Sequence, residues 1–394
     1  MKILMICVQP PWPPDAGTPM RSWGWLRTAA GSADIGLVSL SRGRSEKVDP
    51  ALARYCKYVR LVHVPRPTGR RLRDMLLAVL TGTPYLVQAA RSACMLRAVS
   101  EAIDHWRPDI VQAEWLGAAQ YLAAARLRGL PTVYAAHNVE HQVVAGQAAG
   151  LHRLSAQLTA RALLAAETAY ARSADLVVTV NEQDKKWFQR LLKQVICISN
   201  AVHPAEYRFL PPSGRAKGPV VFVGHLRYPP NLHAAEELIR SVYPLIRRQL
   251  PGTPLLIAGR MPPSRLRRLA GGGVSVLGDI AEIATVWDRA AALLSPLRCG
   301  GGSRIKLLEA AACGVPIIAT EFSAQGLALE PDRDYIAAGD AAGMAAACVA
   351  LLYDPARWDE RARQARSTVE RHHNWNTCTD QIRQLYEGLA HHHR

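Results

Sequence analysis

The chain has 394 residues, of which 49% are hydrophobic and 20% are charged. That length exceeds the size at which a single hydrophobic core stops growing, so we expect two domains. The composition is that of a globular protein and excludes a largely disordered chain. The formal net charge of +16 indicates an anionic partner, unless it only reflects an arginine-rich solvated surface.

The distribution of basic residues and cysteines narrows the choice of partner. Basic clusters occur at 66–73, 265–268 and 357–371, without the interleaved aromatic residues or motifs typical of nucleic-acid binding. We therefore expect no nucleic acid, and favour a phosphate-bearing substrate or a peripheral contact with an anionic membrane surface. The eight cysteines show neither a CxxC pair nor Cys/His ligand spacing, which predicts reduced thiols and no metal site.

Neither of the two most apolar segments has the pattern of a signal or a membrane anchor. The run 2–8 is short and leads at once into a proline-rich stretch, and 151–174 is interrupted by charged residues. We therefore expect a cytoplasmic protein. A peripheral contact with the inner face of the cytoplasmic membrane is compatible with that expectation.

Short apolar runs alternate with amphipathic segments along the chain, which is typical of βαβ units around a parallel sheet. The first predicted strands span 2–8, 35–40, 58–64, 110–112, 132–136, 176–180 and 195–199. A proline- and glycine-rich stretch at 204–219 predicts a linker. The later predicted strands span 220–223, 255–258, 274–277, 292–295 and 317–320. The pattern predicts an α/β protein with Rossmann-like domains at 1–203 and 204–372.

A glycine-rich loop follows the predicted strand 292–295. Gly301 and Gly302 belong to this loop, and Ser303 is the predicted N-cap of the next helix. Ligands of parallel sheets bind at the carboxyl ends of the strands, and a helix start offers free N–H groups and a dipole that favour an anion. Because glycine lets the backbone approach such a guest closely, the loop predicts a phosphate site.

Charged residues in the first turns of this helix strengthen that prediction. Arg304 and Lys306 are basic, although the helix dipole alone favours acidic residues there. Lys306 is the only lysine after Lys217 in an arginine-rich chain, which indicates a compact point charge for phosphate. Glu309 has two interpretations: an i,i+3 salt bridge with Lys306, or a carboxylate that accepts hydrogen bonds from ribose hydroxyls.

The run GGGSRIKLLEAAACGVPIIAT at 300–320 resembles the donor-site signature of retaining GT-B glycosyltransferases of family 4, also called group 1. It is similar in particular to bacterial exopolysaccharide-associated members. The resemblance implies two Rossmann-like domains facing across a cleft, with a closing helix at 373–394 that crosses back to the first domain. Many members carry a glutamate at the position of Gly301, so the contact with the donor sugar departs from the family's pattern here.

The same resemblance implies an activity and roles for residues. A sugar would pass with retention from a nucleotide diphosphate donor to a glycan or lipid-linked acceptor, in polysaccharide or glycolipid biosynthesis, without a cofactor or metal ion. Glu309 would hold the ribose, while Lys306 and Arg304 would meet the diphosphate. The departing phosphate would help to deprotonate the acceptor hydroxyl on the same face of the sugar. The sequence shows no pair of facing carboxylates of the kind that retaining glycosidases use.

Further candidates in the second domain also follow predicted strands. Gly224 and Arg227 follow strand 220–223 and resemble donor-binding positions of the family. Gly259 follows strand 255–258 and is explained equally well by turn geometry. A helix is predicted to start near Asn231, which is either its cap or part of the donor site.

The first domain contributes its own candidates. Gly17 resembles the family's N-terminal glycine loop, which lies against the transferred sugar or phosphates, and Arg21 is either a ligand or a surface charge. His137 follows strand 132–136 and is either structural or, as in similar family members, faces the donor sugar. Asn200 is expected to shape the turn at the domain junction. Trp375, ahead of a helix predicted at 377–389, is expected to act as an apolar clamp.

Two other functions stay open from the sequence. A nucleotide-sugar epimerase or hydrolase of the same fold would use the same donor site. A basic nucleic-acid-binding protein would explain the net charge and would bind in a salt-sensitive way. For the transferase we name His137, Lys306 and Glu309 as the catalytic candidates.

Overall fold

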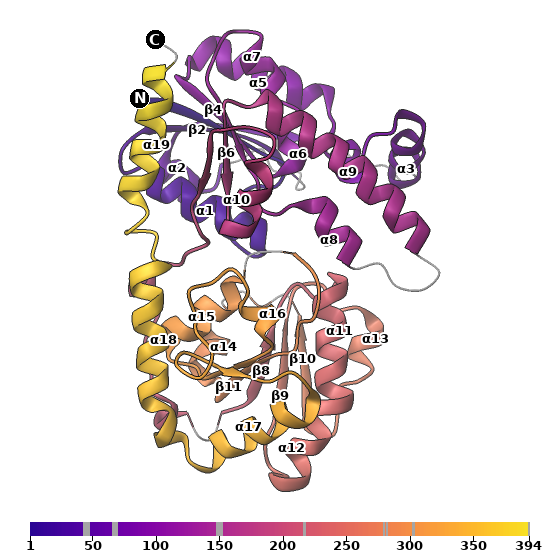
Figure 1. The fold of residues 1–394 in the computed structure, drawn as a ribbon, viewed down its shortest axis with the longest axis vertical. Coiled ribbons are helices and arrows are strands. Elements are labelled where there is room, and N and C mark those ends of the chain that lie inside the picture. Colours follow the sequence, from indigo (N-terminus) through magenta and orange to yellow (C-terminus); the bar gives the residue numbers. More distant parts are fainter. Residues whose placement is uncertain are drawn as a thin grey trace. The chain divides into compact units, whose positions relative to one another are not determined.

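The computed structural model describes residues 1–41, 48–64, 70–146, 153–215, 218–278, 280, 283–301 and 304–392. The chain divides into two compact units, and each is built on one parallel β-sheet with helices packed against it (Figure 1). The first unit contains Met1–Ser199, Gly301–Ser303 and Trp375–Arg394, and the second contains Asn200–Gly300 and Arg304–Asn374.

The first unit contains a seven-stranded sheet in the order β3-β2-β1-β4-β5-β6-β7. The strands are β1 (Lys2–Cys7), β2 (Asp34–Ser41), β3 (Cys56–His63), β4 (Ile110–Glu114), β5 (Thr132–Ala135), β6 (Leu176–Thr179) and β7 (Val195–Cys197). All seven predicted strands are confirmed. β1 is buried along almost its whole length and gives the continuous apolar run that predicts it, whereas the edge strand β3 carries exposed residues along its length. The strand order reverses between β1 and β4, so the crevice expected at such a switch point lies where these two strands end.

Eleven helices of the first unit fall in the described residues. They are α1 (Gly17–Ala29), α2 (Pro50–Tyr55), α3 (Arg70–Thr81), α4 (Tyr85–Ala90), α5 (Ala93–Trp106), α6 (Leu116–Ala119), α7 (Leu122–Arg126), α8 (Glu140–Gly146), α9 (Arg153–Ser173), α10 (Glu182–Phe188) and α19 (Thr379–His392). The helix predicted at 377–389 is α19. It is joined to this unit by a buried chain of hydrogen bonds, in which the Trp25 indole donates to the Tyr386 hydroxyl and that hydroxyl donates to Gln112, each over 2.7 Å.

The segment that precedes α19 is buried against α1. Trp375 is 2% exposed, and a Cβ atom on Gly24 would lie 2.1 Å from the Trp375 indole nitrogen. Arg21 is buried as well, donates to the Ile198 carbonyl over 2.9 Å, and lies 6.0 Å from the Trp375 ring centroid. The interpretation of Arg21 as a surface charge is therefore wrong, because its guanidinium stabilises the interior of the first unit.

The second unit contains a six-stranded parallel sheet in the order β10-β9-β8-β11-β12-β13. The strands are β8 (Val220–Val223), β9 (Leu255–Gly259), β10 (Val274–Gly278), β11 (Ala292–Ser295), β12 (Ile317–Ala319) and β13 (Ile336–Ala337). The five predicted strands are confirmed. The edge strand β13 was not predicted, since two residues are too short to show a period.

The helices of the second unit surround this sheet. They are α11 (Pro229–Glu237), α12 (Tyr243–Gln249), α13 (Ser264–Arg267), α14 (Ala284–Arg289), α15 (Ile305–Cys313), α16 (Glu321–Ala324), α17 (Ala341–Tyr353) and α18 (Asp359–His372), with a π-helical turn at Leu238–Val242 between α11 and α12. Across both units, none of the helices in the described part of the chain is long and apolar enough to cross a bilayer.

The segment predicted as a linker at 204–219 packs into the second unit through a buried arginine. Arg215 donates to the carbonyl oxygens of Leu210 over 2.8 Å, Trp287 over 2.6 Å and Cys313 over 2.5 Å. Because Cys313 is the last residue of α15, this arginine also places positive charge at the carboxyl end of that helix, where the dipole favours it.

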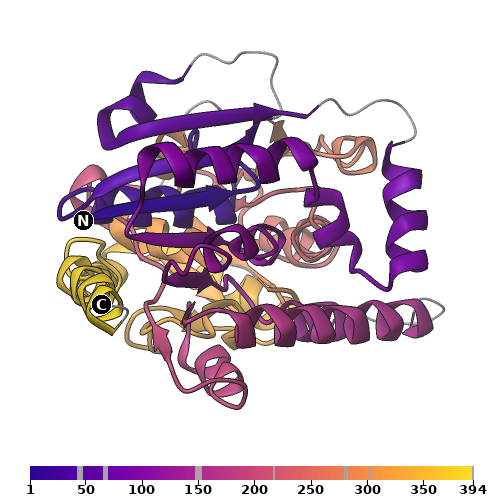
Figure 2. The same ribbon diagram turned by 90° about the horizontal axis from the view of Figure 1, so that it is seen from above.

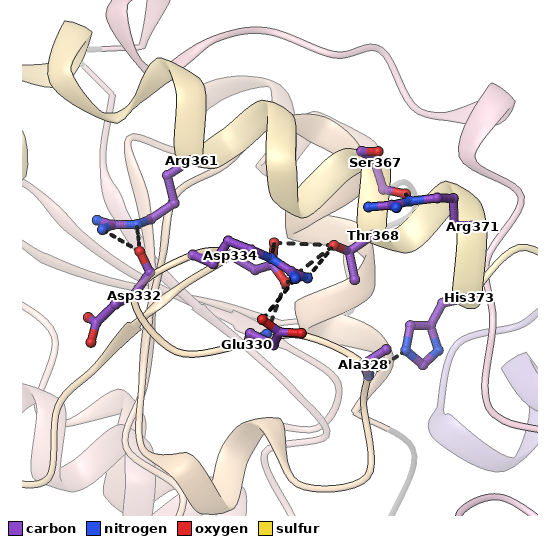
Figure 3. Close-up of polar contacts among 10 residues, drawn as sticks. Ala328, Glu330, Asp332, Asp334, Arg361, Ser367, Thr368, Arg371 and His373 are labelled. Carbon is purple, nitrogen blue, oxygen red and sulfur yellow. Dashed lines mark hydrogen bonds and ion pairs between the residues drawn. The ribbon is translucent and has the colours of Figure 1, made fainter.

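A polar cluster fastens the loop before β13 to α18 (Figure 3). The buried Asp334 carboxylate accepts hydrogen bonds from the Thr368 hydroxyl over 3.2 Å and from the Glu330 backbone N–H over 2.9 Å. His373, just beyond α18, accepts from the Ala328 N–H and donates to the Asn200 carbonyl, each over 2.8 Å. The His373 imidazole, at the end of the second unit's chain, therefore links Asn200, at its start, to the loop that contains Ala328.

Candidate functional site

The helix after the glycine-rich loop begins one residue later than predicted. Its first residue is Ile305, and the N-cap position is occupied by Arg304, whose side chain makes no capping hydrogen bond. The prediction of Ser303 as N-cap is therefore wrong, and Gly302 and Ser303 themselves lie outside the described residues. A helix start without a side-chain cap keeps the N–H groups of its first turn available for an anion.

Lys306 is held inside the second unit. Its Nζ donates to the Asn231 side-chain oxygen over 3.0 Å and lies 4.3 Å from the Phe222 ring centroid. Burial and the neighbouring Arg304 together lower the pKa of Lys306 to about 7, against the opposing effect of Glu309. An anion bound beside this ammonium group would stabilise its charged form and so offset the effect of burial on its pKa.

Glu309 is 4% exposed and accepts a hydrogen bond from the Tyr207 hydroxyl over 3.0 Å. Burial raises the pKa of Glu309 to about 7, against the effect of Tyr207, the Trp287 indole and Lys306. The ion pairs of the described residues include none between Lys306 and Glu309, so the salt-bridge interpretation of Glu309 is wrong. The Lys306 ammonium contacts Asn231 instead, and the Glu309 carboxylate contacts the Tyr207 hydroxyl.

The raised pKa of Glu309 predicts a pH-dependent stability. The ordinary pKa is 4.5 and the folded value is about 7, so in this window the folded protein holds a proton that the unfolded chain has released. The free energy of unfolding should therefore fall as the pH rises from 4.5 to 7, and Glu309→Gln should reduce that fall. Urea unfolding at both ends of the window measures the difference. An identical pH dependence in the variant and the wild type would contradict the shift, and the exposed Glu387→Gln serves as control.

Two glycines bring the ends of β8 and β9 together beside this site. A Cβ atom on Gly259 would lie 1.7 Å from the Gly224 carbonyl oxygen, and one on Gly224 would lie 2.9 Å from Cγ of Asn231. The structure thus gives Gly224 and Gly259 a packing role that places Asn231, and through it Lys306. Asn231 is the third residue of α11 rather than its cap, because Tyr228 occupies the N-cap position and Pro229 the first position of the helix.

Of the remaining predicted donor residues, Arg304 and Gly301 lie at the start of α15 and Arg227 lies before α11. The Arg304 guanidinium is 4.6 Å from the Phe322 ring centroid and 3.4 Å from the Gly300 carbonyl oxygen, and burial lowers its pKa. Gly301 is half-buried, and Arg227 is exposed just before α11. In the second unit, the structure therefore brings Arg304, Lys306 and Glu309 together on one helix.

His137 is buried at the end of β5 in the first unit. Its Nε2 lies 3.0 Å from the Glu114 carboxylate, which also accepts from the Ser22 hydroxyl over 2.8 Å and the Gln112 amide over 2.6 Å. Burial lowers the pKa of His137; the pKa of Glu114, which burial alone would raise, is held below its usual value by the hydrogen bonds from His137 and Gln112. The pair therefore contains a neutral imidazole that donates through Nε2 and leaves Nδ1 as an acceptor.

Trp115, which the sequence analysis missed, occupies an unusual backbone conformation directly after β4. Its φ is 74°, which is rare for a bulky residue, and its indole donates to Glu140 over 2.6 Å. Asn138 donates to the same carboxylate over 3.2 Å. Gly17 is the exposed first residue of α1, after β1. The first unit thus gathers Gly17, Trp115 and His137 after β1, β4 and β5, at the carboxyl edge of its sheet.

The described residues contain no group of three or more His, Cys, Asp or Glu side chains that could hold a metal ion. Positive charge at the candidate site comes instead from Arg304, Lys306 and the start of α15.

Two family models match the chain. Residues 217–354 match the model described as glycosyl transferases group 1, and residues 49–206 match the model described as glycosyltransferase family 4. The chain belongs to the family 4 glycosyltransferases. The two matches cover both units, and the donor signature predicted from the sequence lies inside the first of them.

Known proteins similar to this glycosyltransferase agree with the assignment. The glycogen synthase of Mycobacterium tuberculosis is 29% identical over 98% of this chain and 94% of its own length. The sucrose-phosphate synthase of Thermosynechococcus elongatus has a similar structure, with a TM-score of 0.72 and 19% identity over 99% of both chains. The Anabaena protein HepE, solved with UDP and glucose, gives a TM-score of 0.68 and 15% identity over 98% of this chain and all of its own. These structures confirm the predicted fold class, α/β of the GT-B type with two Rossmann-like domains.

Proposed function

We propose that this glycosyltransferase takes its sugar from a nucleoside diphosphate donor and transfers it with retention to a glycan or a lipid-linked acceptor. The observation that carries the proposal is the start of α15, where the half-buried Lys306 and the buried Glu309 have shifted pKa values and do not pair with each other. Perturbed groups at the carboxyl edge of a parallel sheet are typical of a binding site. The UDP bound to HepE supports the donor class, and the glycogen synthase relative supports a glycan acceptor.

Each residue has a defined part in the proposed reaction. Lys306, Arg304 and the N–H groups of α15 bind the diphosphate and stabilise the charge that it gains when the glycosidic bond breaks. Glu309 accepts hydrogen bonds from the ribose hydroxyls, alongside the Tyr207 hydroxyl that already contacts it. We assign His137, held in one tautomer by Glu114, as a contact of the donor sugar. Because these groups supply the positive charge, the proposed mechanism needs no metal ion. The acceptor oxygen forms its bond to the sugar on the face from which the diphosphate departs, and the departing phosphate takes the proton of the acceptor hydroxyl, so no nucleophile from the protein is needed.

The cellular setting is part of the same proposal. We place the enzyme in the cytoplasm, acting at the inner face of the cytoplasmic membrane in polysaccharide or glycolipid biosynthesis. The basic surface and the family's chemistry support this setting.

A thermal-shift panel tests the donor class. Nucleoside diphosphates and their sugar derivatives should raise the unfolding temperature, because a ligand at 100 times its Kd adds about 2.7 kcal/mol to the free energy of unfolding. One base is expected to give the largest shift, and Glu309→Ala should abolish most of it. The proposal fails if no nucleoside diphosphate stabilises the protein, or if Glu309→Ala is stabilised as much as the wild type.

A further inference from the structure

Helix α3 carries a row of apolar side chains that are exposed to solvent. Five large apolar side chains of this helix are exposed, with fractions of 81% for Val79 and 80% for Leu80; the other three are Leu72, Met75 and Leu76. Soluble proteins rarely leave so many neighbouring apolar side chains open to water unless the patch has a partner.

The arrangement around the helix axis is regular. At 3.6 residues per turn the five apolar side chains fall within one arc of about 140°. Arg71 borders this arc on one side and Arg73 on the other, and both are exposed. Asp74 points to the opposite, inner side and is buried. An apolar stripe edged by arginines, on the outer side of a helix, is the pattern of a helix that lies in a lipid interface.

The first turns of α9 extend this surface. Leu154 and Leu158, one turn apart, are 68% and 59% exposed, and the exposed Arg161 follows on the same face. Figure 1 and Figure 2 both show α3 and the N-terminal end of α9 on the same side of the first unit, with α3 standing away from the sheet.

The charges on α3 decide between a lipid surface and a second copy of the chain. Two copies that packed their α3 helices face to face would bring the arginines at the edges of both stripes together. The one acidic residue of α3, the buried Asp74, pairs with Arg73 of its own helix over 3.3 Å, so Arg71 would meet no carboxylate of α3. Anionic headgroups complement the arginines, while the acyl boundary just below them accepts the apolar arc. A net charge of +16 favours the same partner.

We propose that α3, together with the first turns of α9, seats the first unit on an anionic lipid bilayer. The leucine, methionine and valine side chains enter the headgroup boundary, and Arg71 and Arg73 remain at the phosphate level. This contact deepens the proposed membrane setting and rests on it. It does not depend on the donor site, because it involves none of the residues around α15, so its failure would leave the transfer reaction untouched.

Vesicle sedimentation of the full chain tests the proposal. The wild type should bind vesicles of phosphatidylcholine mixed with phosphatidylglycerol and leave pure phosphatidylcholine vesicles largely unbound. The double variant Val79→Glu/Leu80→Glu should lower the partition coefficient roughly tenfold or more, since two apolar side chains lose their insertion. Arg71→Gln/Arg73→Gln should lower it by roughly fivefold per arginine, and added salt should weaken the wild type in the same direction.

Matched controls separate this helix from general surface effects. Leu127→Glu/Tyr353→Glu changes two exposed large side chains outside α3, which are 86% and 68% exposed, and Arg240→Gln/Arg248→Gln removes the same charge from the second unit. Both controls should bind anionic vesicles within about twofold of the wild type.

Three outcomes would overturn the proposal: wild-type binding that is equal for the two vesicle types, α3 variants that bind as well as the wild type, or a wild-type dimer that Val79→Glu/Leu80→Glu converts to monomer without changing vesicle binding. All variants should keep the donor stabilisation, and all except Arg71→Gln/Arg73→Gln, which loses the ion pair between Arg73 and the buried Asp74, should keep the wild-type unfolding temperature.

Discussion

Replacing Lys306 by methionine is expected to lower kcat/KM for sugar transfer by about 100- to 1,000-fold, the usual effect of removing one donor that stabilises charge in the transition state. Methionine keeps the apolar contact with Phe222 and removes only the ammonium that Asn231 holds in place. The fold should therefore survive the change. Steady-state kinetics and calorimetric titration with the nucleoside diphosphate product measure the loss.

The pH profile gives a second measurement of the same residue. The Lys306 pKa of about 7 implies that its charge, and with it kcat/KM, falls as the pH rises above this value in the free enzyme. Lys306→Met should lack this limb of the profile. Lys186→Met, at an exposed lysine of α10, should keep both rate and profile. A Lys306→Met enzyme whose kcat/KM stays within about threefold of the wild type would remove Lys306 from the site.

Replacing Gly259 by alanine is expected to lower the free energy of unfolding by about 3 kcal/mol or more, at the upper end of overpacking effects. The new Cβ would lie 1.7 Å from the Gly224 carbonyl oxygen, so two strand ends must separate, and no flexible side chain can absorb the clash. Urea unfolding measures the change. Gly252→Ala is the matched control, because nothing lies within 4 Å of its added Cβ.

A milder variant keeps this prediction testable if Gly259→Ala does not fold. Gly224→Ala meets only the Asn231 side chain, at 2.9 Å, which can turn aside. It should cost about 1 to 3 kcal/mol and should also raise the Kd for the donor, since Asn231 then releases Lys306. A Gly259→Ala protein as stable as Gly252→Ala would contradict the close approach of β8 and β9.

Much of the fold could be predicted because parallel strands leave a strong local signal. β1 and β11 are buried along almost their whole length and read as continuous apolar runs. The first residue of a helix was harder to predict, since Ser and Asn, which favour the N-cap position, also occur at positions next to it. Ser303 and Asn231 were expected at helix starts, whereas Arg304 and Tyr228 occupy those positions.

The candidate site was only partly predictable for a related reason. Arg304, Lys306 and Glu309 are close in sequence, so one motif identified them together. Tyr207 contacts Glu309 from 102 positions away, and Glu114 contacts His137 from 23 positions away. Neither partner carries a local pattern that links it to the site. The burial of Arg21 was missed for the same reason, because its partner Ile198 lies 177 positions further along the chain.

The central claim is that the groups at the start of α15 bind a nucleoside diphosphate sugar for transfer to an acceptor. Incubation with donors labelled in the sugar, with and without candidate acceptors, tests this claim most directly when the products are separated by chromatography. We predict labelled acceptor and free nucleoside diphosphate in equal amounts, only when the acceptor is present, and neither product with folded Glu309→Ala. Free sugar or an epimerised donor formed without any acceptor, or undiminished transfer by Glu309→Ala, would contradict it.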